Sequence, residues 1–197
     1  MKKELDLGKE KIGKLLLAFS VPCIISMIIN SIYNIVDQIF IGKGVGIIGN
    51  AATNVIFPIV IICNALAGLV GNGAAANLSL RLGEGKKDEA KKSIGSSITL
   101  LFIISILVVI IFELLLPNLV YAFGCTKNVY SSAMTYGRII VFGSFFMIVY
   151  SGLSQIIRAD GSSKYSMICL LVGAILNIIL DPIFIFKFDL GIAGAAY

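Results

Sequence analysis

Five long apolar segments dominate this sequence, and they decide what kind of protein it can form. They run over residues 15–42, 51–80, 94–116, 129–157 and 165–186. About 20 apolar residues in a helix cross the ~30 Å hydrocarbon core of a bilayer, so each segment is long enough to span it. Residues 191–197 read GIAGAAY and predict the first turns of a sixth helix. We therefore expect an all-α polytopic membrane protein with five full transmembrane helices and the start of a sixth.

Composition and missing residue types narrow the function. The chain is 58% hydrophobic and 14% charged, whereas a soluble domain is about half apolar and a quarter charged. It contains no histidine, which excludes histidine-ligated zinc and Ser-His or Cys-His catalytic dyads within this sequence. No segment matches the phosphate-binding G-x-x-x-x-G-K-S/T pattern. We expect no cofactor and no enzyme activity, and any transport would have to be driven by an ion gradient.

The basic residues predict the orientation, because cytoplasmic loops are enriched in Lys and Arg. Twelve of the 16 lie before the first span, between the second and third, and between the fourth and fifth. Only Lys43, Lys127 and Lys187 lie in the other gaps. We therefore expect residues 1–14 to form a cytoplasmic N-terminal segment, ahead of a transmembrane unit over 15–197. Because the charges sit in short gaps between spans, nucleic acid is not an expected partner.

Two acids inside the spans are the main candidate site residues. A charge in hydrocarbon costs at least ~2.5–3.5 kcal/mol, so each needs a reason to be there. Asp37 ends a polar stripe of the first span, and Asp181 shares a helical face with Asn177. The remaining stripe residues are Ser26, Asn30, Tyr33 and Asn34. We expect this stripe to face other helices or a wet cavity, because lipid cannot satisfy it.

Asp37 and Asp181 are expected to lie at the same depth in the membrane. Both spans run from the cytoplasm outward, and each acid lies about five residues, or ~7 Å, before the outer end of its span. Pro182 follows Asp181 and frees a carbonyl one turn back. Carboxylate, amide and carbonyl oxygens are ligands for Na⁺ or for a proton. Two carboxylates in one cavity also disfavour each other's ionisation, which suits a site that takes up and releases protons.

Weaker signals lie in the other spans. Glu113 of the third span is expected either to reach toward the interface or to meet Arg138 of the fourth. Tyr136 is a candidate to face the cavity of the acids, and Pro22 and Pro58 predict kinks. The second span has a stripe of small residues that favours close helix packing over the lining of a substrate path. That stripe comprises Ala65, Gly68, Asn72, Ala75 and Ser79.

Four stretches together resemble the N-terminal half of a multidrug and toxic-compound extrusion (MATE) transporter of the prokaryotic type. They are VPCIISMIINSIYNIVDQIFIG, RLGEGKKDEAKKS, QIIRADGSSKYSM, and NIILDPIFIF followed by GIAGAAY. The resemblance covers nearly the whole sequence in order. It implies two six-helix lobes in the bacterial or archaeal plasma membrane. It also implies export of organic, often cationic compounds by alternating access, in exchange for Na⁺ or H⁺.

The resemblance also assigns roles to residues. Cation binding in the N-terminal lobe would fall on Asp37, Asn177 and Asp181, with Tyr136 matching a cavity tyrosine. Asn30, Tyr33 and Asn34 are our additions as cavity-lining residues.

The sequence is shorter than a complete family member, which suggests a fragment. It lacks a second lobe, and we expect transport to require that C-terminal lobe. The alternatives are a lipid-linked-sugar flippase of the same broader fold, a non-transporting membrane assembly subunit and, least favoured, an intramembrane aspartyl enzyme. A flippase would favour a basic cavity, whereas the first and fifth spans offer acids.

Overall fold

The computed structural model describes residues 12–197, and the first 11 residues of the predicted cytoplasmic segment lie outside the described part. Five helices are long and apolar enough to cross a membrane. The elements are α1 (Ile12–Gly44), α2 (Ile47–Gly83), α3 (Lys87–Ala122), α4 (Lys127–Ala159), α5 (Ser163–Pro182), the π-helix η1 (Ile183–Lys187) and α6 (Ile192–Ala196). The expected fold class, with five spans and the start of a sixth, is confirmed.

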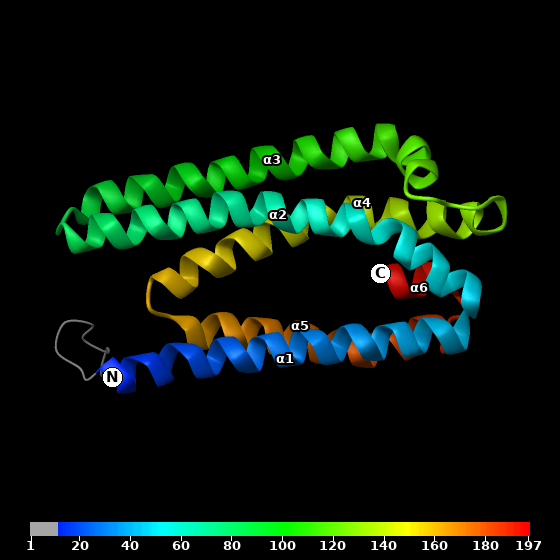
Figure 1. The fold of residues 1–197 in the computed structure, drawn as a ribbon, viewed down its shortest axis with the longest axis horizontal. Coiled ribbons are helices and arrows are strands. Elements are labelled where there is room, and N and C mark those ends of the chain that lie inside the picture. The colour runs from blue at the N-terminus through cyan, green and yellow to red at the C-terminus, as the bar shows by residue number, and fades with distance from the viewer. Residues whose placement is uncertain (1–11) are drawn as a thin grey trace.

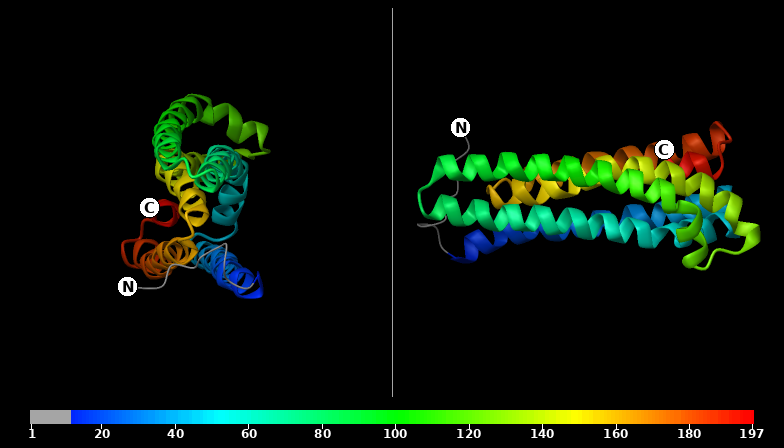
Figure 2. Two further views of the ribbon diagram at one scale, coloured as in Figure 1. Left: turned by 90° about the vertical axis from the view of Figure 1, so that its left-hand side faces the viewer. Right: turned by 90° about the horizontal axis from the view of Figure 1, so that it is seen from above.

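The helices form two groups that lie along one another. α2 packs mainly on α4 and α3, while α1 packs mainly on α5 and touches α2 much less. Seen end-on, α3 lies on one side, α2 and α4 occupy the middle, and α1 and α5 form the opposite side (Figure 2). The start of α1, the α2–α3 turn and the α4–α5 turn lie at one end of the molecule (Figure 1). The basic turns therefore share an end, as the predicted orientation requires.

Glycine stops three of the long helices in the same way. After α2, α3 and α4, a glycine with positive φ is followed by a residue whose N–H bonds a carbonyl five residues back. The bonds are Lys86 to Arg81, Cys125 to Val120, and Ser162 to Ile157, at 2.9–3.1 Å. Glycine adopts this left-handed conformation without a Cβ clash and so satisfies carbonyls that the helix end would leave free. These turns end helices that extend past the apolar segments.

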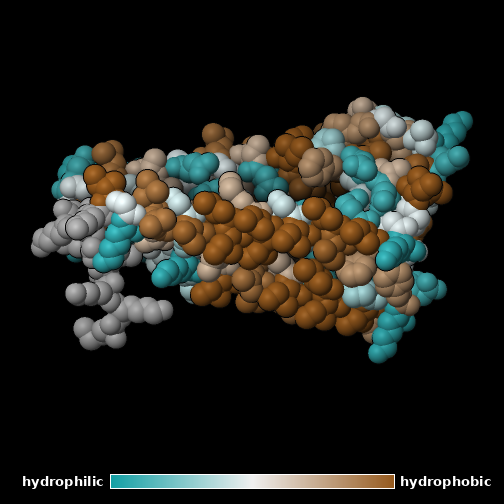
Figure 3. All heavy atoms as spheres, turned by 60° about the horizontal axis from the view of Figure 1, so that its bottom comes forward, coloured by the Kyte–Doolittle hydropathy of each residue, from teal (hydrophilic) through white to brown (hydrophobic). Residues whose placement is uncertain are grey.

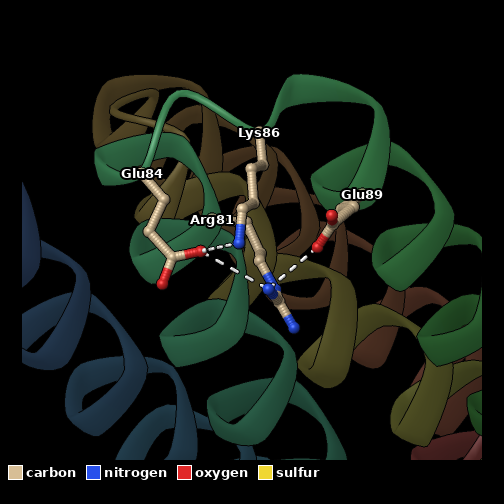
Figure 4. Close-up of polar contacts among 4 residues, drawn as sticks. All are labelled: Arg81, Glu84, Lys86 and Glu89. Carbon is tan, nitrogen blue, oxygen red and sulfur yellow. Dashed lines mark hydrogen bonds and ion pairs between the residues drawn. The ribbon is translucent and has the colours of Figure 1, made fainter.

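Ion pairs brace the α2–α3 turn. Arg81 contacts Glu89 at 2.8 Å and Glu84 at 3.4 Å, and Lys86 contacts Glu84 at 3.0 Å (Figure 4). All four side chains are at least one-third exposed, so each pair contributes only about 0–1 kcal/mol. The network fixes a polar turn at the membrane surface.

The lipid-facing surface is hydrophobic between polar ends. On the side of α1 and α5, a broad apolar band covers the middle of the molecule, and hydrophilic residues gather toward its two ends (Figure 3). Side chains such as Met27, Ile35 and Ile179 are exposed on these helices. In water such a surface would drive aggregation, whereas in a bilayer it is the expected lipid contact.

The close packing of α2 on α4 depends on a different set of small residues than the sequence suggested. Ala67, Gly71 and Ala74 are buried, while Ala65, Asn72 and Ser79 of the expected stripe are exposed. A Cβ added at Gly71 would lie 2.9 Å from the backbone of Gly152. The packing interpretation of the stripe is therefore wrong within this chain. The contact face lies next to it on the helix, where small residues occur as well.

The Gly71 contact yields a prediction. Gly71→Ala should lower the stability of the α2–α4 contact by about 1–3 kcal/mol, because the new methyl meets backbone that cannot rotate away. Gly73→Ala is the matched control, since nothing lies within 4 Å of its added Cβ. The measurement is the midpoint of thermal unfolding of the purified protein in detergent. A Gly71 variant as stable as the Gly73 variant would contradict the contact.

Candidate functional site

Asp37 and Asp181 meet between α1 and α5. Asp37 is half-buried on α1, and Asp181 is 4% exposed at the end of α5. The two carboxyl groups lie close enough to interact electrostatically. Because both helices run in the same direction, two acids at the same distance from their outer ends arrive at the same depth. The structure thus brings together the two acids that the sequence singled out.

Asn177 completes the set from one turn away on α5. Its Nδ2 donates a hydrogen bond to Asp181 Oδ1 at 3.0 Å. Five buried side-chain oxygens have no hydrogen-bond partner within residues 12–197, and three of them belong to this set: Asp37 Oδ1, Asn177 Oδ1 and Asp181 Oδ2. An unpaired buried oxygen costs about 1–3 kcal/mol. Three on neighbouring side chains form an oxygen-rich site suited to a proton or Na⁺.

This set differs from a divalent-metal centre. Within the described residues, no three His, Cys, Asp or Glu side chains gather as metal ligands. The two carboxyl groups carry at most two negative charges, and a single bound proton or monovalent cation would reduce this to one.

Tyr136 approaches the acids from the middle layer. This α4 tyrosine is close enough to Asp37, Asp181 and Tyr33 to interact with them electrostatically. Tyr33 in turn lies near Asp37 and within reach of the Asn34 side chain. Tyr136 and Tyr33 thus join the acid cluster, which draws residues from α1, α4 and α5.

Asn30 and Asn34 lie elsewhere on α1. Both are exposed, and Asn34 Nδ2 donates to the backbone oxygen of Asn30 at 2.6 Å and to its Oδ1 at 3.0 Å. Asn34 also lines an open groove of about 600 Å³ with Gln38 and Asn50. Ser26, at the start of the polar stripe, is buried and bonds the Pro22 carbonyl at 2.8 Å. The stripe therefore divides into a packed part, an exposed part and the acid cluster.

Sequence reasoning missed two neighbours of the cluster. Gln38 lies within hydrogen-bonding reach of Asp37, and Thr53 of α2 donates to Gln38 Oε1 at 3.3 Å. Tyr150 of α4 lies near Tyr33. Gln38 adjoins Asp37 but falls off its helical stripe. Tyr150 was detectable, because it is 14 residues from Tyr136 and so on the same helical face.

The end of α5 is irregular where the site lies. Pro182 follows Asp181, and η1 begins at the next residue. A proline provides no N–H to bond the preceding turn, and the wider π-turn absorbs the mismatch. Gly44 allows η1 to lie against the end of α1, because a Cβ there would overlap the Ile185 side chain. The outer end of the α1–α5 pair is thus held together just beyond the two acids.

Comparisons with known proteins agree with this architecture. A family model described as MatE matches residues 22–183. The multidrug export protein MepA of Staphylococcus aureus is 33% identical over 190 residues, which cover 95% of this chain and 42% of MepA. The probable multidrug resistance protein YoeA of Bacillus subtilis is 25% identical over 194 residues, covering 96% of this chain and 42% of YoeA.

A solved structure, that of the MATE multidrug transporter DinF-BH, superposes on all of this chain and on 44% of that protein. Its TM-score is 0.92 and its sequence identity is 37%. The chain spans less than half the length of each of these three proteins. The resemblance noted in the sequence is confirmed, and the chain is a multi-pass membrane protein of bacterial type that belongs to the MATE family of multidrug transporters.

Proposed function

We propose that this chain is the cation-coupling part of an antiporter that exports organic, often cationic compounds from the bacterial cell by alternating access. The coupling ion, Na⁺ or H⁺, binds at Asp37, Asn177 and Asp181. The multidrug names of MepA and YoeA support the substrate class. The complete activity further requires a second lobe that covers the exposed polar faces of α1 and α2.

The observation that carries the proposal is the meeting of two acids and an amide, each with an unpartnered buried oxygen. Their cost inside the bilayer is offset when a cation or proton binds. The unpartnered oxygens are free to take up the proton or cation that the proposal requires.

Coupling follows from where the ligands come from. Asp37 lies on α1, whereas Asn177 and Asp181 lie on α5, so any shift between these helices changes the affinity for the ion. An ion moves a conformational equilibrium only by the difference in its affinity for the two states. We propose that the ion favours the outward-open state, where it helps substrate leave.

The exposed small and polar face of α2 belongs to the same proposal. Asn54, Asn72 and Ser79 repeat along one side of α2 and are exposed within this chain. Amide groups are costly in hydrocarbon, so this face needs protein or water against it. We propose that it lines the path of the substrate between the two lobes.

The first prediction concerns transport. Asp37→Asn and Asp181→Asn should each abolish ethidium efflux by the complete gene product, because an amide cannot take up a proton or balance a cation. Efflux is measured as the fluorescence decay of loaded cells. Membrane abundance, measured by immunoblot, should stay at the parent level.

Asp160→Asn is the matched control, since Asp160 is an exposed acid in the α4–α5 turn. It should export ethidium at the parent rate. Parent rates in both Asp37 and Asp181 variants would overturn the site.

A second prediction concerns the geometry on which the site depends. In a background without Cys23, Cys63, Cys125 and Cys169, Asp37→Cys combined with Asp181→Cys should cross-link under mild oxidation in native membranes. A protease site inserted at the α2–α3 turn lets the two halves separate on a non-reducing gel unless they are linked.

Ile35→Cys with Asp181→Cys is the control pair, because Ile35 is 60% exposed and lies on another face of α1. It should remain unlinked. Equal linking of both pairs, or of neither, would count against the α1–α5 arrangement.

A further inference from the structure

A second feature lies on α3 and α4, away from the acid cluster. It is an apolar groove of about 340 Å³ lined by Ile106, Val109, Ile110, Phe142, Phe145 and Phe146. Phe142 and Phe146 are 60% and 73% exposed. The groove opens toward the side of α4 opposite Tyr136, because Phe145 is nine residues, or two and a half turns, along the helix. It therefore faces the surroundings of the protein rather than the ion site.

Aromatic rings build one wall of this groove. Phe145 packs edge-on against Phe102 at 5.6 Å between ring centres, and against Phe146 at 5.2 Å. Such edge contacts hold rings in fixed orientations and limit how far they can collapse into the groove. The groove is thus a built apolar slot between two helices.

An ion pair lies at the outer end of the groove. Arg138 is one turn before Phe142 on α4, and Glu113 is one turn after Val109 and Ile110 on α3. Arg138 Nε lies 3.3 Å from Glu113 Oε1 in an ion pair, which confirms the predicted meeting of the two residues. The Arg138 side chain is 62% exposed and that of Glu113 is 30% exposed.

The pair leaves most of the guanidinium available. Glu113 engages Nε, while the two terminal nitrogens of Arg138 carry further N–H donors suited to a phosphate. α4 has 33 residues and therefore extends ~10 Å beyond each side of a ~30 Å hydrocarbon core.

Arg138 lies 11 residues, or ~16 Å, from the outer end of α4, and its side chain leans toward that end. Its head therefore reaches the headgroup region.

We propose that the groove binds an anionic phospholipid of the outer leaflet, with its phosphate on Arg138 and one acyl chain along the phenylalanines. The positive charge of Arg138 at the rim complements the lipid phosphate, and the apolar slot below it matches the acyl chain. Glu113 positions the guanidinium and does not itself contact the lipid. The site is independent of the coupling ion and of transport.

The test uses a tryptophan reporter in the groove, because this sequence contains no tryptophan. Phe146→Trp is introduced into the complete gene product. The protein is reconstituted in vesicles with increasing fractions of phosphatidylglycerol or phosphatidylcholine that carry brominated chains, which quench nearby tryptophan. The same protein without the substitution provides the background.

Half-quenching should need about tenfold less phosphatidylglycerol than phosphatidylcholine, which corresponds to ~1.4 kcal/mol. Arg138→Gln should remove this preference. Lys127→Gln should keep it, because Lys127 is an exposed cation of the same helix end outside the groove.

A Glu113→Gln variant separates phosphate binding from a merely structural ion pair. It should keep the preference for phosphatidylglycerol, since removing a neighbouring negative charge favours an anion. Loss of the preference in Glu113→Gln as well as in Arg138→Gln would overturn the proposal. So would equal quenching by both lipids in the parent reporter, or no quenching by either, which would mean that protein covers the groove.

Discussion

The cost of a polar group in hydrocarbon governs this molecule. Backbone groups escape that cost by forming helices, and the chain accordingly consists of long helices joined by tight glycine turns. Polar side chains avoid this cost by pairing with each other, by reaching the membrane–water interface or by binding an ion or a ligand. Asp37 with Asp181 and Arg138 with Glu113 are two solutions to the same problem. The first places two acids together, and the second places an acid against a base, although Glu113 Oε2 also stays buried without a hydrogen-bond partner.

The helices fall into a closely packed group and a more lightly attached pair. α2, α3 and α4 form a closely packed group with large fully buried side chains such as Ile59, Leu101 and Ile148. The α1–α5 pair carries both acids and connects to that group through fewer contacts, among them the Thr53–Gln38 hydrogen bond. A closely packed group beside a more lightly attached pair would let α1 and α5 move relative to the rest, as the proposed coupling requires.

Much of this was predictable from the sequence, for identifiable reasons. Apolar length fixes the spans, and the rarity of acids in hydrocarbon singles out Asp37 and Asp181. The helix ends were less predictable, because α2 runs from Ile47 to Gly83, beyond the apolar segment at both ends. The packing face of α2 was misjudged, because small residues occur on both sides of the helix. Gln38 carried no signal, since its partner Thr53 comes from another helix.

The opposed faces of α4 have a consequence for how such a protein changes over generations. Tyr136 lies close enough to the acids to interact with them electrostatically, whereas Phe145, half a helical turn round from it, lines the apolar groove with Phe142 and Phe146. Residues without shared partners contribute almost additively to stability, so substitutions on the two faces accumulate with little interference. A lineage that enters a membrane of different lipid content can therefore alter the phenylalanine face alone and leave the acid cluster unchanged.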